Sequence, residues 1–284
     1  MERLNVLKTY KLYIGGAFPR TESGRYYKVT DKKDAVIANL CTASRKDFRN
    51  AVVAARKAQK GWAGRSAYNR SQILYRIAEM AEGRSDQLIH ELTLIGFSPA
   101  KAKTEVTETI DRLIYYAGWC DKYQQIAGAI NPVASSHFNF SVPEPTGVVS
   151  IIGTERHPLL GMVTEISAAI ASGNTAIYLA PNSAGLPAMS FAEIFHTSDV
   201  PAGVINILTG SIGELKSHFS SHMDVNALVI CDTEKANWSD EMSAAAENVK
   251  RMVFRSTDYM KSGKSLTTIT DLCEIKTTWH PIGA

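Results

Sequence analysis

A regular alternation of short apolar runs and helical segments constrains the fold more than any other feature of this chain. The apolar runs are rich in β-branched and aliphatic residues, as expected of strands that are buried on both faces. They cover residues 147–152, 175–179, 204–208 and 227–231. Helical patterns occupy the intervals at 163–171, 186–196 and 212–220. A β-α-β-α-β-α-β order with short connections predicts an α/β fold with a doubly wound parallel sheet.

Further elements are predicted on either side of this unit. Residues 10–37 are aromatic and punctuated by glycine, which favours one or two β-hairpins. Ser44 and Asp47 have the spacing of a capping box and open a helix that continues to Trp62. Other helical patterns cover 68–81, 87–94, 101–125 and 240–250. Residues 128–142 alternate in the two-residue manner of strands, and residues 265–281 read as one or two edge strands.

Composition excludes several classes of function. A net charge of +3 without a basic stripe argues against nucleic-acid binding. The N-terminus has no apolar region typical of a signal peptide, and no window of 18 uncharged apolar residues could form a membrane span, so we expect a cytoplasmic protein. The four cysteines are far apart, which argues against a disulfide framework and a zinc site. His218 and His222 have helical spacing but no third ligand nearby, so we expect no metal.

Several sequence blocks in register resemble the first half of an aldehyde dehydrogenase. In order they read LYIGGAF, WAGRSAYNRSQILYRIAEM, EPTGVVSIIG, PLLGMV, ASGNTAIYL, DVPAGVINILTG and SHMDVNALVICD. The resemblance covers roughly residues 10–235 and implies a Rossmann-like domain that binds a nicotinamide nucleotide. It also implies that residues 126–146 form a protruding antiparallel strand pair, through which family members assemble into dimers and tetramers.

The end of the chain resembles the last strand of the family, which joins the protruding pair at the subunit interface. This resemblance lies at residues 274–278. Between Asp232 and that strand a family member would carry a catalytic domain of about two hundred residues, whereas this chain has about forty. We therefore expect a nucleotide-binding-type domain at 1–265, interrupted by the strands at 126–146, and a C-terminal oligomerisation strand at 266–284.

The family resemblance predicts that no residue of this chain is catalytic. The nucleophilic cysteine and the glutamate that activates water belong to motifs of the missing part. Cys273 lies in a strand-like segment and lacks the glycine-flanked loop of the family nucleophile. The oxyanion asparagine would fall in the loop at 153–158, where Thr154 and Glu155 stand instead. Arg156 or His157 could donate to an oxyanion, and the alternative is a surface loop with a local charge pair.

The positions expected to hold the cofactor are also altered. In the family a lysine ends the strand at 175–179 and a glutamate follows three residues later, and both hold the adenosine ribose. Leu179 and Asn182 occupy these places, and each unpaired polar group of a ligand would cost about 1–3 kcal/mol. Gly210 belongs to a glycine pair too weak for a phosphate loop, and Asp232 would repel a pyrophosphate. We expect no cofactor, with NAD or NADP bound through other contacts as the alternative.

The altered positions lack the residues that the family uses for catalysis and for cofactor binding. The two segments implied in assembly, residues 126–146 and 274–278, are both present. The residues expected at an interface are His137, Phe138, Phe140, Ile275, Thr277 and Trp279. For Trp279 a terminal packing role is the alternative. The truncated outline resembles the remnant second half of the two-part aldehyde dehydrogenases of family 16.

We therefore expect a pseudoenzyme, a catalytically inactive subunit that acts by oligomerisation with a full-length aldehyde dehydrogenase or with itself. One alternative is an NAD(P)-binding aldehyde oxidoreductase component whose nucleophile comes from a partner chain. Another is a nucleotide- or metabolite-sensing module that uses the loop at 153–158.

Overall fold

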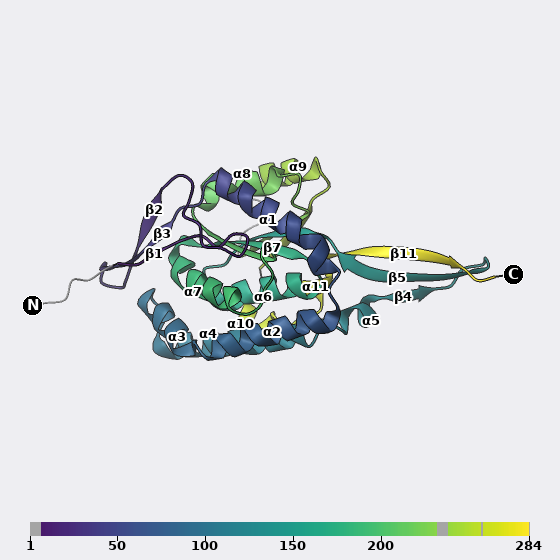
Figure 1. Ribbon diagram of the computed structural model, residues 1–284, viewed down its shortest axis with the longest axis horizontal. Coiled ribbons are helices and arrows are strands. Elements are labelled where there is room, and N and C mark those ends of the chain that lie inside the picture. The colour runs from purple at the N-terminus through teal and green to yellow at the C-terminus, as the bar shows by residue number, and fades with distance from the viewer. Residues whose placement is uncertain (1–6, 232–237, 257, 284) are drawn as a thin grey trace, which may run out of the picture.

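A five-stranded parallel sheet forms the centre of the molecule (Figure 1). The computed structural model describes residues 7–231, 238–256 and 258–283. The strand order is β10-β9-β6-β7-β8, and every neighbouring pair is parallel. The strands are β6 (Val148–Ile152), β7 (Thr175–Ala180), β8 (Ile205–Thr209), β9 (Ala227–Cys231) and β10 (Arg251–Arg255). This arrangement confirms the predicted fold class.

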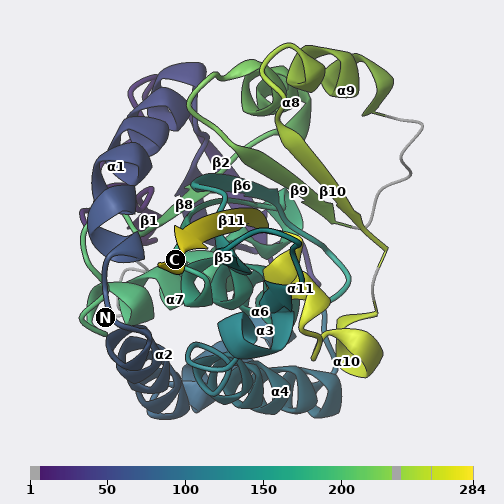
Figure 2. The same ribbon diagram turned by 90° about the vertical axis from the view of Figure 1, so that its right-hand side faces the viewer.

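Helices cover both faces of the central sheet (Figure 2). On one face α6 (Pro158–Ala171) and α7 (Gly185–His196) contact the strands. Three helices pack outside them: α2 (Ala67–Glu82), α3 (Ser85–Leu94) and α4 (Pro99–Ala117). The other face carries α1 (Arg45–Ala63), α8 (Ile212–Ser221) and α9 (Ser239–Ala246). Each face buries its own apolar cluster, and the predicted capping box of Ser44 and Asp47 opens α1.

The first strands form a small sheet of their own. It has the order β1-β3-β2, with β1 (Thr9–Tyr10) parallel to β3 (Val36–Cys41) and β2 (Tyr26–Thr30) antiparallel to it. β2 and β3 form a hairpin as predicted, but it extends to Cys41, past the predicted end at residue 37. Thr209 ties this sheet to the central one, because its hydroxyl donates to the carbonyl of Cys41.

Two helices end earlier than the sequence predicted. The helix predicted over 101–125 ends at Ala117, where Gly118 caps it, and α5 (Tyr123–Ala127) follows a turn. Glycine in a helix interior costs about 1 kcal/mol relative to alanine, which favours an end at that point. The helix predicted over 240–250 ends at Ala246. Val249 then has a positive φ of 56°, and the chain enters β10, a strand that the sequence did not predict.

The segment predicted as strands over 265–281 is partly helical. After β10 come two short helices, α10 (Tyr259–Ser262) and α11 (Thr267–Thr270), and only then β11 (Cys273–Pro281). The sequence of α11 is rich in threonine, which favours a strand by propensity. Packing decides otherwise, because Thr268 and Ile269 are buried and α11 contacts α6.

A three-stranded antiparallel sheet projects from the body, and we call it the arm (Figure 1). Its order is β11-β5-β4, where β4 is Ala129–Asn131 and β5 is His137–Pro145. Ile275 pairs with Pro143, and Trp279 pairs with Asn139. Figure 1 shows the arm extending away from the helices on the side opposite the small N-terminal sheet. The final strand therefore joins the protruding pair within one chain.

The described helices include none that is both long and apolar enough to cross a membrane.

Candidate functional site

Loop 153–158 and the start of η1 (Asn182–Ala184) meet at the carboxyl end of β6 and β7, where open parallel sheets bind their ligands. Gly153 donates its N–H to the carbonyl of Leu179 at 3.0 Å. The Ser183 hydroxyl donates to Glu155 at 3.0 Å. Glu155 and Asn182 are both exposed. The structure thus brings these two predicted positions to one edge of the sheet.

Three other predicted cofactor positions, Thr154, Leu179 and Gly210, are buried. Leu179 is fully buried in the apolar cluster shared with α1 and α8. Thr154 is also buried, and its hydroxyl accepts the N–H of Arg156 at 3.1 Å. Gly210 has φ +152°, and a Cβ there would lie 3.1 Å from the backbone nitrogen of Ala43. Asp232 lies outside the described residues. At the positions that the structure describes, protein atoms surround these residues and leave no room for a ligand.

An aromatic side chain adds to the packing between α8 and α9. Trp238 is buried in the same apolar cluster as Leu179. The Lys216 ammonium lies 5.6 Å from its ring centroid and pairs with Glu241 at 2.9 Å. A cation placed over an indole face is attracted by the ring's negative face. Lys216 and Trp238 therefore hold α8 and α9 together on this face of the sheet.

A buried ionic cluster fixes the segment that follows β10. The Glu165 carboxylate of α6 lies 3.3 Å from Arg255 and accepts the Tyr259 hydroxyl at 2.9 Å. Arg255 also pairs with Asp271 at 2.6 Å. Burial raises the pKa of Glu165, and Arg255 opposes that rise. Burial would lower the pKa of Arg255, but Glu165 and Asp271 raise it above its ordinary value.

Two side chains of α4 complete this anchorage from the other side. Arg112 is fully buried, and it donates to the Thr164 hydroxyl at 2.7 Å and to the carbonyl of Tyr259 at 2.8 Å. The Tyr116 hydroxyl donates to the carbonyl of Gly263 at 2.9 Å. Burial lowers the pKa of Arg112 and raises that of Tyr116 beyond its usual range. Residues 258–263 are thus bound tightly across α4 and α6.

The cysteines have the surroundings of core residues. All four are buried thiols. Burial raises the pKa of Cys273 to about 11 and that of Cys120 to about 12. The sulfur of Cys231 lies 3.2 Å from the Tyr259 hydroxyl, inside the buried cluster. A nucleophilic cysteine needs access and a lowered pKa, so neither Cys120 nor Cys273 is placed for covalent catalysis.

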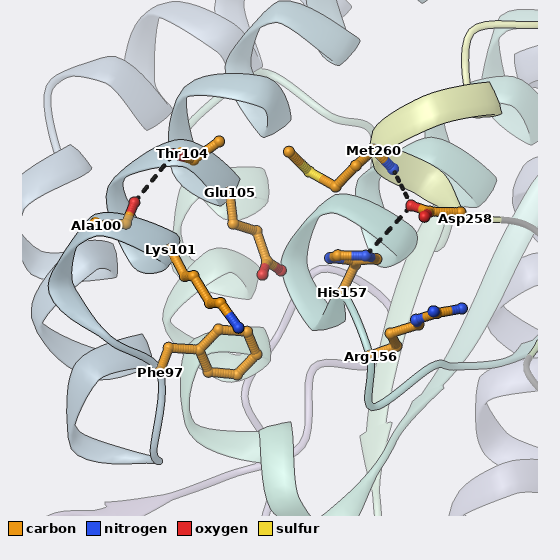
Figure 3. Close-up of a pocket in the computed structure, with 9 residues that line it drawn as sticks. All are labelled: Phe97, Ala100, Lys101, Thr104, Glu105, Arg156, His157, Asp258 and Met260. Atoms are coloured by element: carbon orange, nitrogen blue, oxygen red, sulfur yellow. Dashed lines mark hydrogen bonds and ion pairs between the residues drawn. The ribbon is translucent and has the colours of Figure 1, made fainter.

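A pocket of about 520 Å³ opens between α4, loop 153–158 and α10, and we call it the α4–α10 pocket (Figure 3). Its lining comprises Phe97, Ala100, Lys101, Thr104, Glu105, Arg156, His157, Asp258 and Met260. The sequence singled out Arg156 and His157 in this loop, and the structure places both in the pocket wall.

Glu105 is the most deeply buried group of the α4–α10 pocket. Its carboxylate accepts the N–H of Leu159 at 2.9 Å and that of Leu160 at 3.4 Å, at the first turn of α6. Burial raises the pKa of Glu105 to about 7, although the two backbone N–H groups lower it. The sequence analysis did not identify Glu105, Arg112 or Glu165 as buried charged residues. The only sign of them in the sequence is a charged residue on the apolar face of each helix.

The described residues contain no group of three or more histidine, cysteine, aspartate or glutamate side chains arranged to hold a metal ion. His222 instead packs edge-on against Phe48, with ring centroids 5.8 Å apart. Its Nδ1 accepts the N–H of Asp224.

These features define a doubly wound α/β protein with a projecting three-stranded arm. The sequence pattern of the aldehyde dehydrogenase family matches residues 18–278, so the chain belongs to that family. It is 32% identical over 249 residues to the putative aldehyde dehydrogenase DhaS of Bacillus subtilis (strain 168), covering 86% of this chain and 50% of DhaS. It is 30% identical over 258 residues to cytosolic 10-formyltetrahydrofolate dehydrogenase of Mus musculus, covering 89% of this chain and 29% of that protein.

Solved structures show the same relation. The NAD+ complex of an aldehyde dehydrogenase from Bacillus cereus superimposes with a TM-score of 0.81 at 26% identity. The match covers 87% of this chain and 50% of the Bacillus cereus protein. The chain therefore spans about half the length of this structural relative.

Proposed function

We propose that this chain is a non-catalytic member of the aldehyde dehydrogenase family that acts by assembly through the arm. The partner is a full-length aldehyde dehydrogenase or a second copy of the chain. The observation that carries the proposal is the arm itself. β11 follows an abbreviated connection after β10, yet it pairs with β5 along nine residues, from Cys273 with Pro145 to Pro281 with His137.

The surface of the arm supports this proposal. By strand alternation, His137, Ile275, Thr277 and Trp279 lie on one face, and Phe138 and Phe140 lie on the other. Ile275 and Trp279 are 61% and 55% exposed. Phe138 and Ile130 line a groove with Phe140 along the arm, next to α5. Exposed apolar surface on a projecting element is typical of a protein interface.

The arm is held rigidly at its base, which favours a role in assembly. Asn174 donates to the carbonyl of Leu272 at 2.8 Å and accepts the N–H of Gly147 at 2.7 Å. Arg251 of β10 pairs with Glu274 of β11 at 2.8 Å. A preorganised surface loses less conformational entropy on binding.

The packing of the cofactor positions supports the absence of catalysis. Leu179 is buried in the core, and the buried Cys273 thiol has a raised pKa. A second candidate function is NAD(P) binding by an oxidoreductase component that takes its nucleophile from a partner. It is favoured by the same fold in the Bacillus cereus NAD+ complex.

Size-exclusion chromatography with light scattering tests assembly. The chain is measured alone and with a complete aldehyde dehydrogenase of the same genome. We expect a complex that is lost in I275K and W279S, since both residues lie exposed on the arm. The matched control is V53K, because Val53 is 60% exposed on α1 and far from the arm in sequence. Monomers in every sample, or equal assembly in all variants, would contradict the proposal.

A further inference from the structure

We propose that four basic side chains on α1 and α8 bind a phosphate monoester in its dianionic form. They are Arg45 and Arg49 of α1, His218 of α8 and His222, which caps the C-terminal end of α8, and we call them the α1–α8 cluster. The cluster lies on the face of the central sheet opposite α6 and α7. This inference goes beyond the proposed function and does not depend on assembly through the arm.

Aromatic contacts bring α1 and α8 together at the cluster. The rings of Phe48 and Phe219 are stacked with their centroids 4.1 Å apart, and the His222 ring packs edge-on against Phe48 at 5.8 Å. Both phenylalanines are buried, and Arg49 and His218 directly adjoin them in the chain. Figure 1 shows α1 and α8 next to each other on this face. The stacked rings therefore fix the spacing of the two helices where the basic residues lie.

The basic side of α1 is turned toward α8. Arg56 donates to Oδ1 of Asn226 at 2.6 Å and to the carbonyl of Asp224, and both acceptors lie just beyond the end of α8. Arg45 and Arg49 precede Arg56 by eleven and seven residues, about three and two turns of helix, so all three share one side of α1. Arg45 and Arg49 are therefore placed along the edge of α1 that faces α8.

Each histidine of the cluster is influenced by one of the two arginines. Burial lowers the pKa of His218, and the charge of Arg45 lowers it further. Burial also lowers the pKa of His222, and the charge of Arg49 adds to that effect. Exposed charges act on each other mainly within a Debye length of about 10 Å. The contacts and these charge effects together show that the four side chains converge between the two helices.

The cluster has more positive than negative charge around it. Within the described part of the chain, neither Arg45 nor Arg49 forms a salt bridge. Asp47, the one acid of α1, is buried in the capping box. The acids of adjoining segments pair with other cations: Glu22 with Lys46, Glu214 with Arg25 and Asp224 with Arg56. Because like charges repel, an anion from solution would relieve the repulsion within the cluster.

The donors of the cluster favour a phosphate monoester over a carboxylate. Guanidinium groups donate through a planar fork that matches phosphate oxygens, and Arg45 and Arg49 supply two such forks. Nδ1 of His222 accepts the N–H of Asp224, so the neutral ring carries its hydrogen on Nε2 and can donate there. A phosphate monoester has nearly two negative charges at pH 7 and three strong acceptor oxygens. Two forks and two imidazoles match that charge and number of acceptors better than they match a carboxylate.

Binding of a dianion should also take up protons. Both histidines have pKa values below the ordinary 6.5, so they are mostly neutral at neutral pH in the free protein. Besides Arg49, the charged groups that act on His222 are Asp224, which raises its pKa, and Lys250, which lowers it. A bound dianion favours the protonated imidazoles. Affinity should therefore increase as the pH is lowered from 8 toward the ordinary pKa of histidine.

Isothermal titration calorimetry at low ionic strength and neutral pH tests the proposal with glycerol 3-phosphate, acetate and glycerol. We expect glycerol 3-phosphate to bind most tightly and with proton uptake, measured in two buffers of different ionisation enthalpy. R45Q and R49Q should each weaken its binding about tenfold, as expected for loss of a charge-assisted hydrogen bond. H218Q should reduce the proton uptake. K60Q is the matched control, because Lys60 is an exposed cation about 16 Å further along α1 than Arg49.

Vesicles distinguish a soluble ligand from a lipid headgroup of the same chemistry. Flotation is measured with phosphatidylcholine vesicles with and without phosphatidic acid, whose headgroup is a phosphate monoester. Binding that requires phosphatidic acid and is lost in R45Q and R49Q, without binding of glycerol 3-phosphate, would assign the ligand to a lipid. Binding of glycerol 3-phosphate would assign it to a soluble molecule.

Several results would overturn the phosphate site. They are acetate binding as tight as that of glycerol 3-phosphate, unchanged affinity in R45Q and R49Q, an equal loss in K60Q, and no binding of either phosphate source. Circular dichroism of each variant checks that it is folded. The arm variants I275K and W279S keep the α1–α8 cluster and should bind glycerol 3-phosphate like the wild type, so a failure of either proposal is recognised independently.

Discussion

Replacement of Glu105 by glutamine is expected to stabilise the protein at neutral and alkaline pH. The side chain is 2% exposed and caps the first turn of α6, and its pKa is raised from 4.5 to about 7 by burial. Ionisation is therefore more difficult in the folded than in the unfolded chain. Glutamine keeps an oxygen that can accept the N–H of Leu159 but has no charge to bury.

The sign and size follow from proton linkage. Below pH 4.5 Glu105 is protonated in both states, so its ionisation contributes nothing there. As pH rises from 4.5 to about 7, the unfolded chain loses this proton first and folding stability falls. Each pH unit of displacement corresponds to about 1.4 kcal/mol, so the total penalty above pH 7 is about 3 kcal/mol.

Urea denaturation followed by circular dichroism over this pH range measures the effect. E105Q should match the wild type in acid and exceed it by up to about 3 kcal/mol above pH 7. E105A is the matched control, because it leaves the Leu159 N–H unpaired and should be less stable than E105Q by about 1–3 kcal/mol at every pH. A stability difference between E105Q and wild type that does not change with pH would refute the reasoning.

Three other expectations can be checked with standard assays. G161A should destabilise by about 1–3 kcal/mol, because its Cβ would lie 2.3 Å from Thr154 Cγ2. G213A, another helical glycine with nothing nearer than 3.6 Å, should stabilise by about 0.5–1 kcal/mol in thermal unfolding. Ellman's reagent should label the native chain only slowly and all four thiols after unfolding, since the cysteines are buried; rapid labelling would contradict this packing. Millimolar NAD or NADP should leave the thermal midpoint unchanged, and a clear rise would favour the NAD(P)-binding alternative.

The central sheet could be predicted because each of its strands from β6 to β9 is a short run of mainly apolar residues. Such runs carry their own signal, and the helices between them have clear spacing. β10 has arginine at both ends and only half-buried residues, so its sequence does not show the apolar run of a buried strand. Its arginines are paired with Glu165, Asp271 and Glu274, residues that are distant in sequence.

The candidate site was only partly predictable, because its walls come from segments that are distant in sequence. Loop 153–158 stood out because its residues differ from the family pattern, and Arg156 and His157 indeed line a pocket. The opposite wall, with Lys101 and Glu105, comes from a helix whose amphipathic pattern gives no sign of a ligand. Asp258 and Met260 reach the pocket through a helix of four residues, too short for periodicity to reveal.

Hydrogen–deuterium exchange of the arm tests the central proposal most directly. Exchange is measured on the chain alone and in a mixture with a complete aldehyde dehydrogenase of the same genome. Assembly through the arm predicts slower exchange within β11 (Cys273–Pro281) and β4 (Ala129–Asn131) in the mixture or at high concentration of the chain alone. Unchanged exchange in both strands under conditions where a complex forms, or protection confined to the helices of the body, would contradict the account.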